Sequence, residues 1–114
     1  MYTQDQAVDV LQEVCQSCKP IFGNELKRGY LYGSYARGDQ HKESDIDILL
    51  IVDLSPEVLC QFRRDVAFVA SELSLKHEIT VSISVNSYRQ FLRFSDTLPY
   101  YQNVIREGIC YGLS

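Results

Sequence analysis

The sequence predicts an α/β (α+β) fold, with a small mixed β-sheet packed against helices in a single domain spanning residues 1–114. Three observations favour this fold class. Hydrophobic residues make up 46% of the chain, which is enough for one packed core. Apolar residues recur at helical spacing in some segments and at strand spacing in others. No apolar run reaches the roughly 20 residues that a membrane-spanning helix requires.

The first half of the chain contains one predicted helix and two predicted strands. Apolar residues recur at helical spacing over 4–19, and Pro20 follows. The segments 26–32 and 45–52 have the composition of strands. The second strand is apolar on both faces, which is typical of a central buried strand.

The second half contains three predicted helices and one more strand. Ser55 is a good N-cap for a helix over 55–75. The segment 78–85 alternates between apolar and polar residues, which predicts a strand with one polar face. Helices are predicted over 88–94 and 98–108. The resulting order, α-β-β-α-β-α-α, predicts one sheet covered by helices.

The net charge is −4, which argues against long nucleic acid as a partner, because phosphate backbones are bound by clusters of Lys and Arg. A small anionic ligand is compatible with this charge, because backbone N–H groups and a metal ion can bind it. The first residues lack the basic and apolar blocks of a signal peptide. We therefore expect a soluble, cytoplasmic protein with no membrane partner.

Four cysteines raise the question of a metal or redox site. Cys15 and Cys18 form a C-x-x-C pair, but Cys60 and Cys110 are isolated from it and from each other. A zinc site needs a second close pair of ligands. Because three-residue spacing in a helix places both thiols on one face, we interpret Cys15 and Cys18 as core residues.

Asp45 and Asp47 are the first candidates for chemistry. Residues two apart in a strand point to the same face, about 6–7 Å apart along the chain. Like charges at this distance repel each other, and a bound divalent cation such as Mg²⁺ relieves the repulsion. The alternative interpretation is that both aspartates are solvated at the end of a strand.

Gly33 and Ser34 follow the first predicted strand and begin a turn. Glycine allows a phosphate to approach the backbone closely, and the serine hydroxyl supplies a further donor. A Gly-Ser pair alone is typical of an ordinary turn, but together with Asp45 and Asp47 it predicts a site for a phosphate and a metal. Arg37 has two interpretations, a phosphate contact or an ion pair that braces the loop.

These residues form a pattern: Gly-Ser, ten residues, then Asp-x-Asp. The segment Gly-Ser-x-Ala-Arg-Gly from Gly33, with Ser-Asp-Ile-Asp-Ile-Leu from Ser44, resembles the polymerase-β-type nucleotidyltransferase superfamily. The resemblance is to its single-domain, antitoxin-like branch of minimal nucleotidyltransferases. It is dense over 32–52, and the segment 99–111 resembles the ending of some single-domain members.

The resemblance implies a nucleotidyltransferase fold and an enzyme that uses Mg²⁺ and ATP or another nucleoside triphosphate. Gly33 and Ser34, with Arg37 as a further candidate, would bind the nucleotide. Asp45 and Asp47 would be catalytic residues and metal ligands. The reaction would transfer AMP to a hydroxyl, and single-domain relatives often modify a tyrosine of a helical HEPN-type toxin. Oligomeric state is left open, including a homo-oligomer.

One feature departs from the family pattern. Active members usually carry a third carboxylate on a nearby strand. The polar face of the segment 78–85 offers Thr80, Ser82 and Ser84 but no aspartate. Glu78 is the acidic residue nearest this position, either as a displaced third catalytic residue or as a solvated residue at the strand end.

Two hypotheses are alternatives to transfer of AMP to a protein, and the missing third carboxylate motivates the first of them. The chain could be a catalytically weak or inactive nucleotide-binding module, an antitoxin that acts by binding its partner. The aromatic residues near the C-terminus are either its contact surface or part of the core: Tyr88, Phe91, Phe94, Tyr100 and Tyr101. The other hypothesis is modification of a small molecule, as in aminoglycoside-type relatives, which usually need an additional helical domain or a dimer.

Overall fold

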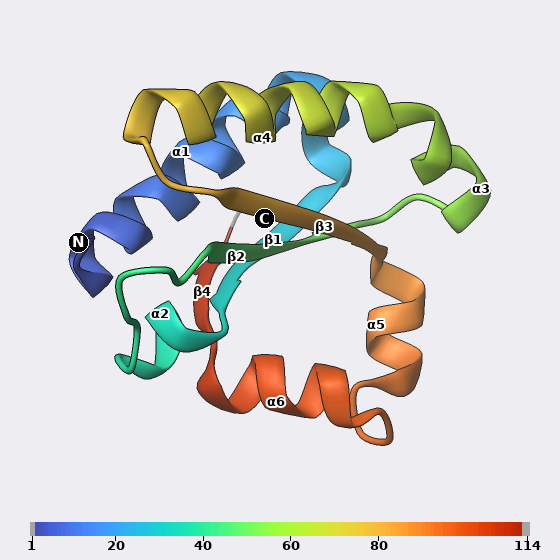
Figure 1. The fold of residues 1–114 in the computed structure, drawn as a ribbon. Helices are drawn as coiled ribbons and strands as arrows, with labels where there is room; N and C mark the ends of the chain where they lie inside the picture. Colours follow the sequence, from blue (N-terminus) through green and yellow to red (C-terminus); the bar gives the residue numbers. More distant parts are fainter. Residues whose placement is uncertain (1, 113–114) are drawn as a thin grey trace.

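A computed structural model describes residues 2–112 and places a four-stranded sheet between two layers of helices (Figure 1). Helices α1 and α4 cover one face of the sheet, and α5 and α6 lie on the other. The elements are α1 (Gln4–Phe22), η1 (Gly23–Glu25), β1 (Leu26–Tyr32), α2 (Ser34–Arg37), β2 (Ile46–Val52), α3 (Pro56–Leu59), η2 (Cys60–Phe62), α4 (Arg63–His77), β3 (Val81–Ser87), α5 (Tyr88–Phe94), α6 (Pro99–Glu107) and β4 (Ile109–Gly112).

The strands are arranged in the order β3-β2-β1-β4. Strand β2 pairs parallel with β3 and antiparallel with β1, and β1 pairs antiparallel with β4. The sheet is therefore mixed, as the sequence predicts. Every residue of β2 is buried except Asp47, which is half-buried, so the prediction of a central buried strand is also confirmed.

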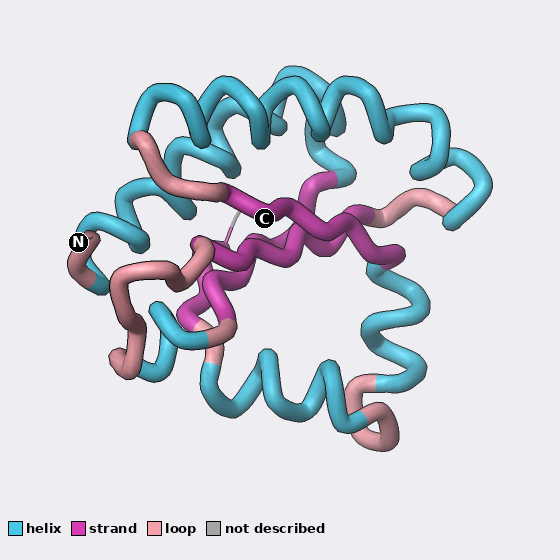
Figure 2. The backbone as a smooth tube through the Cα atoms, in the orientation of Figure 1, coloured by secondary structure: helices cyan, strands magenta, loops and turns pink. Residues whose placement is uncertain are grey.

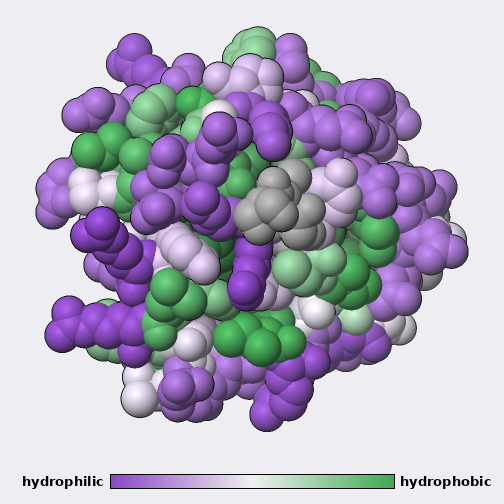
Figure 3. All heavy atoms as spheres, turned by 180° about the vertical axis from the view of Figure 1, so that it is seen from behind, coloured by the Kyte–Doolittle hydropathy of each residue, from purple (hydrophilic) through white to green (hydrophobic). Residues whose placement is uncertain are grey.

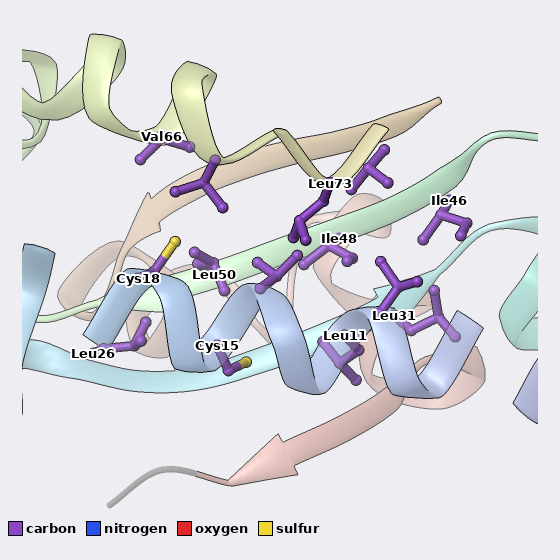
Figure 4. Close-up of a cluster of buried hydrophobic side chains, with 14 of the residues drawn as sticks. Leu11, Cys15, Cys18, Leu26, Leu31, Ile46, Ile48, Leu50, Val66 and Leu73 are labelled. Carbon is purple, nitrogen blue, oxygen red and sulfur yellow. The ribbon is translucent and has the colours of Figure 1, made fainter. Parts of the chain in front are cut away.

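The face covered by α1 and α4 contains most of the hydrophobic core. Figure 4 shows side chains of α1, α4, β1 and β2 pointing into the space between the helices and the sheet. Cys15 and Cys18 are fully buried there. Burial raises the pKa of the Cys15 thiol to about 12 and that of Cys18 to about 11, so both thiols stay protonated. The interpretation of the pair as core residues is confirmed.

The opposite face has a smaller core, built largely from aromatic rings. Its buried members are Tyr30, Leu49, Ile51, Phe91, Tyr101 and Val104. Tyr88 and Phe94 are half-buried, and 41% of the surface of Tyr100 is exposed. The aromatic residues near the C-terminus are thus mainly core, and Tyr100 is the exception.

Several predicted boundaries are wrong. Helix α1 continues through Pro20 to Phe22, whose ring is buried, so packing offsets the hydrogen bond that proline removes. The predicted helix over 55–75 is interrupted by a 3-10 turn between α3 and α4. Strand β4 was not predicted, because four residues are too few for a visible alternation.

No helix within residues 2–112 has both the length and the apolar character needed to cross a membrane. The face seen from behind is mainly hydrophilic, with hydrophobic residues in several separate groups (Figure 3).

Candidate functional site

The turn from β1 into α2 is built on Gly33. This residue is the N-cap of α2, with φ 77° and ψ −156°, a conformation that L side chains rarely adopt. Its carbonyl oxygen accepts hydrogen bonds from the N–H groups of Ala36 and Arg37, both at 3.2 Å. These two N–H groups are therefore used within the turn, and those of Ser34 and Tyr35, at the start of α2, are the ones that can donate to an acceptor outside the helix.

Gly33 lies directly against Asp47, although the two are far apart in sequence. Tyr32 pairs with Asp47 across the β1–β2 ladder, which brings the following turn to the carboxylate. A Cβ atom on Gly33 would lie 2.6 Å from Oδ2 of Asp47, closer than real Cβ contacts allow. The structure therefore brings together the glycine turn and the aspartate pair that the sequence singles out separately.

The ionised carboxylate of Asp47 is in an unfavourable environment. It lies on the sheet face that α5 and α6 cover, and it is half-buried. Burial, and then the negative charge of Asp45, raises the pKa of its carboxyl group above the ordinary value. A divalent cation between the two carboxylates would remove both penalties, so the residues present fit the Mg²⁺ that the sequence predicts.

Asp45 is placed by a short polar loop that precedes β2. The loop lies beside α2, at the end of the sheet where β2 begins (Figure 2). Its conformation is held by His41 and Ser44, because the N–H of His41 donates to Oγ of Ser44 at 2.9 Å. The N–H of Ile46 then donates to the carbonyl oxygen of Thr80 at 2.9 Å. Asp45 itself stays exposed, where a ligand can reach it.

Arg37 braces the site in this structure. Its Nε lies 3.2 Å from a carboxylate oxygen of Asp39, and its guanidinium lies 3.6 Å from Glu107 of α6. The side chain is 44% exposed, so both ion pairs are screened by water and are weak. The bracing interpretation describes the observed contacts, and a phosphate contact of Arg37 stays a prediction.

Strand β3, where a third carboxylate is expected, contains no acidic residue. Strand β3 runs parallel to β2 with Ser82 opposite Asp47. By alternation, Ser82, Ser84 and Asn86 share the sheet face of Asp47, and none of them is acidic. The sequence therefore predicts correctly that the polar face of this strand lacks an aspartate.

The structure does not bring Glu78 to the aspartate pair. The strand begins at Val81 instead of Glu78, because Glu78 ends α4 in a left-handed conformation with φ 54° and ψ 38°. Burial, and then the charges of Glu13 and Glu78, raise the pKa of the Tyr2 hydroxyl, and Tyr2 lies next to His77 of α4. Among residues 2–112, no group of three or more His, Cys, Asp or Glu side chains could hold a metal ion.

A small cavity of about 200 Å³ adjoins the glycine turn. Its lining comes from two sides, the β1–α2 turn and helix α6: Tyr32, Gly33, Arg37, Tyr100, Asn103, Val104 and Glu107. Sequence reasoning gave no role at this site to Tyr32, Asn103 or Glu107, because only the packing of α6 brings the last two beside the turn. The resemblance of the segment 99–111 to other family members was the available signal.

A larger cavity of about 410 Å³ lies between α3, α4 and the edge strand β3. Its lining includes Phe62, Arg63 and Val85 but neither Gly33 nor the aspartate pair. The smaller cavity does include Gly33, which lies against Asp47, so we place the candidate site there, between the glycine turn and the aspartate pair.

A mixed sheet whose glycine turn meets a carboxylate pair at the start of a buried strand fits an enzyme that handles nucleotides. The match to a family makes this class specific. Residues 11–107 match the nucleotidyltransferase domain family, so the chain belongs to that family and is a nucleotidyltransferase.

Similar proteins agree with this assignment. "Putative protein adenylyltransferase MJ0141" from Methanocaldococcus jannaschii is 34% identical over 77 residues, covering 68% of this chain and 76% of the relative. "Putative protein adenylyltransferase MJ0604" from the same organism is 30% identical over 98 residues, covering 86% and 90%. The solved structure "Crystal structure of the toxin-antitoxin with AMP-PNP" has the same fold, with a TM-score of 0.52 and 21% identity over 99% of this chain and 76% of that chain.

Proposed function

We propose that the chain transfers AMP from ATP, with Mg²⁺, to a hydroxyl group of a partner protein. The observation that carries the proposal is the contact between Gly33 and Asp47, beside Asp45. A phosphate can approach the backbone at Gly33 closely, and the two aspartates can hold the cation that neutralises the charge of the phosphate.

Each of these residues has a defined task. The backbone at Gly33 and the start of α2, with the Ser34 hydroxyl, would orient the triphosphate. Asp45 and Asp47 would hold Mg²⁺, which supplies charge neutralisation at the phosphates when it is bound. Because Asp47 is half-buried, it would hold its ligand in a fixed position against the turn.

The acceptor is best explained as a phenol. With serine opposite Asp47, no carboxylate of β3 is available to take the proton from an attacking hydroxyl. A tyrosine hydroxyl, with a pKa of about 10, loses its proton more readily than the aliphatic hydroxyl of serine or a sugar. A tyrosine acceptor therefore depends least on the missing base.

Two comparisons support a protein partner. The relatives from Methanocaldococcus jannaschii are named as protein adenylyltransferases, and a solved structure with the same fold is of a toxin-antitoxin with AMP-PNP. Together with the resemblance to the antitoxin-like branch of the family, they motivate the proposal that the partner is a helical HEPN-type toxin and that the chain acts as its antitoxin in the cytoplasm.

ATP binding measured by calorimetry, with and without Mg²⁺, tests the site. We expect metal-dependent binding by the wild-type protein and none by the Asp45→Asn/Asp47→Asn variant. The matched control is Asp53→Asn, at the other end of β2, which should bind as the wild type does. Transfer of label from α-labelled ATP to a tyrosine-containing partner should follow the same pattern. Equal transfer by the double variant would refute the proposal.

A second candidate function follows from Ser82. If the missing third carboxylate abolishes transfer, the chain is an antitoxin that binds nucleotide and partner without chemistry. This function predicts Mg²⁺-dependent ATP binding without any transfer of label. It also predicts that the Asp45→Asn/Asp47→Asn variant still suppresses the toxicity of a co-expressed partner.

A further inference from the structure

Tyr100 lies near Asp47, on the other side of Tyr32. Helix α6 begins at Pro99, so Tyr100 is in its first turn. Its ring packs edge-on against Tyr32, with ring centroids 5.8 Å apart and an interplanar angle of 89°. Tyr32 is the strand partner of Asp47. Burial, the neighbouring Tyr32 hydroxyl and the charges of Tyr32, Tyr101 and Asp47 all raise the pKa of the Tyr100 hydroxyl, which places it within electrostatic reach of Asp47.

Tyr100 also shares a cavity with the phosphate-binding turn. Gly33 and Arg37 line one side of the 200 Å³ cavity, and Tyr100 and Asn103 line the other. A nucleotide held at Gly33 and Asp47 would thus have its phosphates next to the face of α6 that carries Tyr100.

Tyr100 is the accessible member of three tyrosines around this site. Tyr101 is buried, and its hydroxyl accepts a hydrogen bond from Nδ2 of Asn86 at 2.9 Å. Tyr32 is half-buried at the end of β1. Tyr100 is 41% exposed and lines the cavity, so of the three it is the one that a ligand entering the cavity can reach.

From this arrangement we propose that Tyr100 is an acceptor within the chain itself, so that the protein adenylylates its own Tyr100. The inference rests on the proposed function, since it needs ATP and Mg²⁺ at Gly33, Asp45 and Asp47. The phenolic oxygen attacks the α-phosphorus and the bond between the α- and β-phosphates breaks. Tyr100 then carries AMP through a phosphodiester, pyrophosphate leaves, and the phenolic proton passes to water.

The modification would act on the site that produces it. An AMP group on Tyr100 would lie across the cavity between Gly33 and α6, where the next nucleotide has to bind. Self-modification would therefore slow further transfer of AMP. A partner that covers Tyr100 would prevent the self-modification. An enzyme of this kind would be active chiefly while its partner is bound.

Intact-mass spectrometry of the full chain after incubation with ATP and Mg²⁺ tests the inference, followed by peptide mapping. We expect a mass increase of one AMP, located on Tyr100, whose rate constant does not depend on protein concentration. The Tyr100→Phe variant keeps the ring that packs on Tyr32 and should lose the label completely. The neighbouring Tyr101→Phe variant should keep it.

The outcomes separate this inference from the proposed function. Unmodified protein that still binds ATP with Mg²⁺ overturns the inference and leaves the proposed function standing. Label that persists in Tyr100→Phe, or a rate constant that rises with protein concentration, also overturns it. Protein that binds no ATP in calorimetry refutes both.

Discussion

The two faces of the sheet share the same strands but contain different chemistry. The face under α1 and α4 is packed with aliphatic side chains, and its two thiols are held neutral by burial. The face under α5 and α6 has a smaller aromatic core that ends at the half-buried carboxylate of Asp47. On the first face the buried thiols are uncharged, as burial favours. On the second face burial disfavours the ionised form of the Asp47 carboxylate.

Strand β2 contains residues of both kinds, because one of its faces contributes to the stability of the fold and the other contributes to the candidate site. In β2 the side chains of Leu50 and Asp47 point to opposite faces, only three residues apart. Burial of the Leu50 side chain stabilises the folded state, whereas burial of the ionised Asp47 carboxylate destabilises it. A protein keeps such a conflict where a ligand resolves it, which is the physical reason for placing the site on the second face.

The largest expected effect is on the first face. Leu50→Ala should lower the free energy of unfolding by about 2–5 kcal/mol, because a fully buried leucine leaves a cavity. Urea denaturation followed by circular dichroism measures this loss. Exposed Leu75→Ala, on α4, is the control and should change stability little. Similar losses for the two variants would break the comparison between core and surface.

Gly33→Ala tests the contact between the turn and the carboxylate. The positive φ costs about 1–3 kcal/mol for a residue with a side chain, and the added Cβ would collide with Asp47. We expect both a loss of stability and a loss of Mg²⁺-dependent ATP binding.

Gly23→Ala provides a matched control for this variant. Gly23 also has a positive φ, 60°, but a Cβ there would meet nothing within 4 Å. It should lose stability to a similar extent and keep ATP binding. Loss of binding in both variants would show that strain, and not the collision with Asp47, explains the result.

Glu13→Gln should have a smaller effect, on the first face. A hydrogen bond from Lys76 lowers the pKa of the Glu13 carboxyl group, and His77 contributes. The ionised carboxylate therefore stabilises the fold above its ordinary pKa, and this contribution is lost as the pH falls through the lowered pKa. The variant should be at most about 1 kcal/mol less stable near neutral pH, because water screens the pair.

Thermal melts over a pH series measure the Glu13→Gln effect. The difference from the wild type should shrink towards acid pH. Glu72→Gln, on an exposed carboxylate of α4 without an ion pair in the described part of the chain, should show no difference. A difference that grows towards acid pH would contradict the expected sign of the Glu13 contribution.

The smallest expected effect is at Asp47, and its sign is opposite. A raised pKa means that the folded state prefers the protonated carboxyl group. The stabilisation is fully present below the ordinary pKa and is lost as the pH rises through the raised pKa. Without divalent cations, Asp47→Asn should therefore melt slightly above the wild type at neutral pH, and the two should converge at acid pH.

Added Mg²⁺ and ATP sharpen this last comparison. The melting temperature of the wild type should rise, because a ligand that binds only the folded state stabilises it. The Asp47→Asn variant should not respond. If Asp47→Asn is less stable than the wild type at neutral pH without metal, the ionised Asp47 carboxylate does not destabilise the fold.

Much of the fold was predictable because its signals are local. The apolar run after Asp47 identifies the central strand, and the alternation in the segment 78–85 identifies β3 apart from its two ends. That start was misplaced because Glu78 adopts a left-handed conformation, which glycine usually marks in a sequence and glutamate does not. Strand β4 exists only through its pairing with β1, which a four-residue segment does not reveal.

By itself, the sequence determined the types of chemistry present: a glycine turn, two aspartates on one strand face, and no acid on the polar face of the next strand. The tertiary structure alone decided which groups meet. It placed Gly33 against Asp47 through the β1–β2 register, and Tyr100 beside them through the docking of α6. The physical reason is that side-chain chemistry and short-range periodicity are properties of neighbours in the chain. Register and docking depend on the packing of the whole core, which no local pattern encodes.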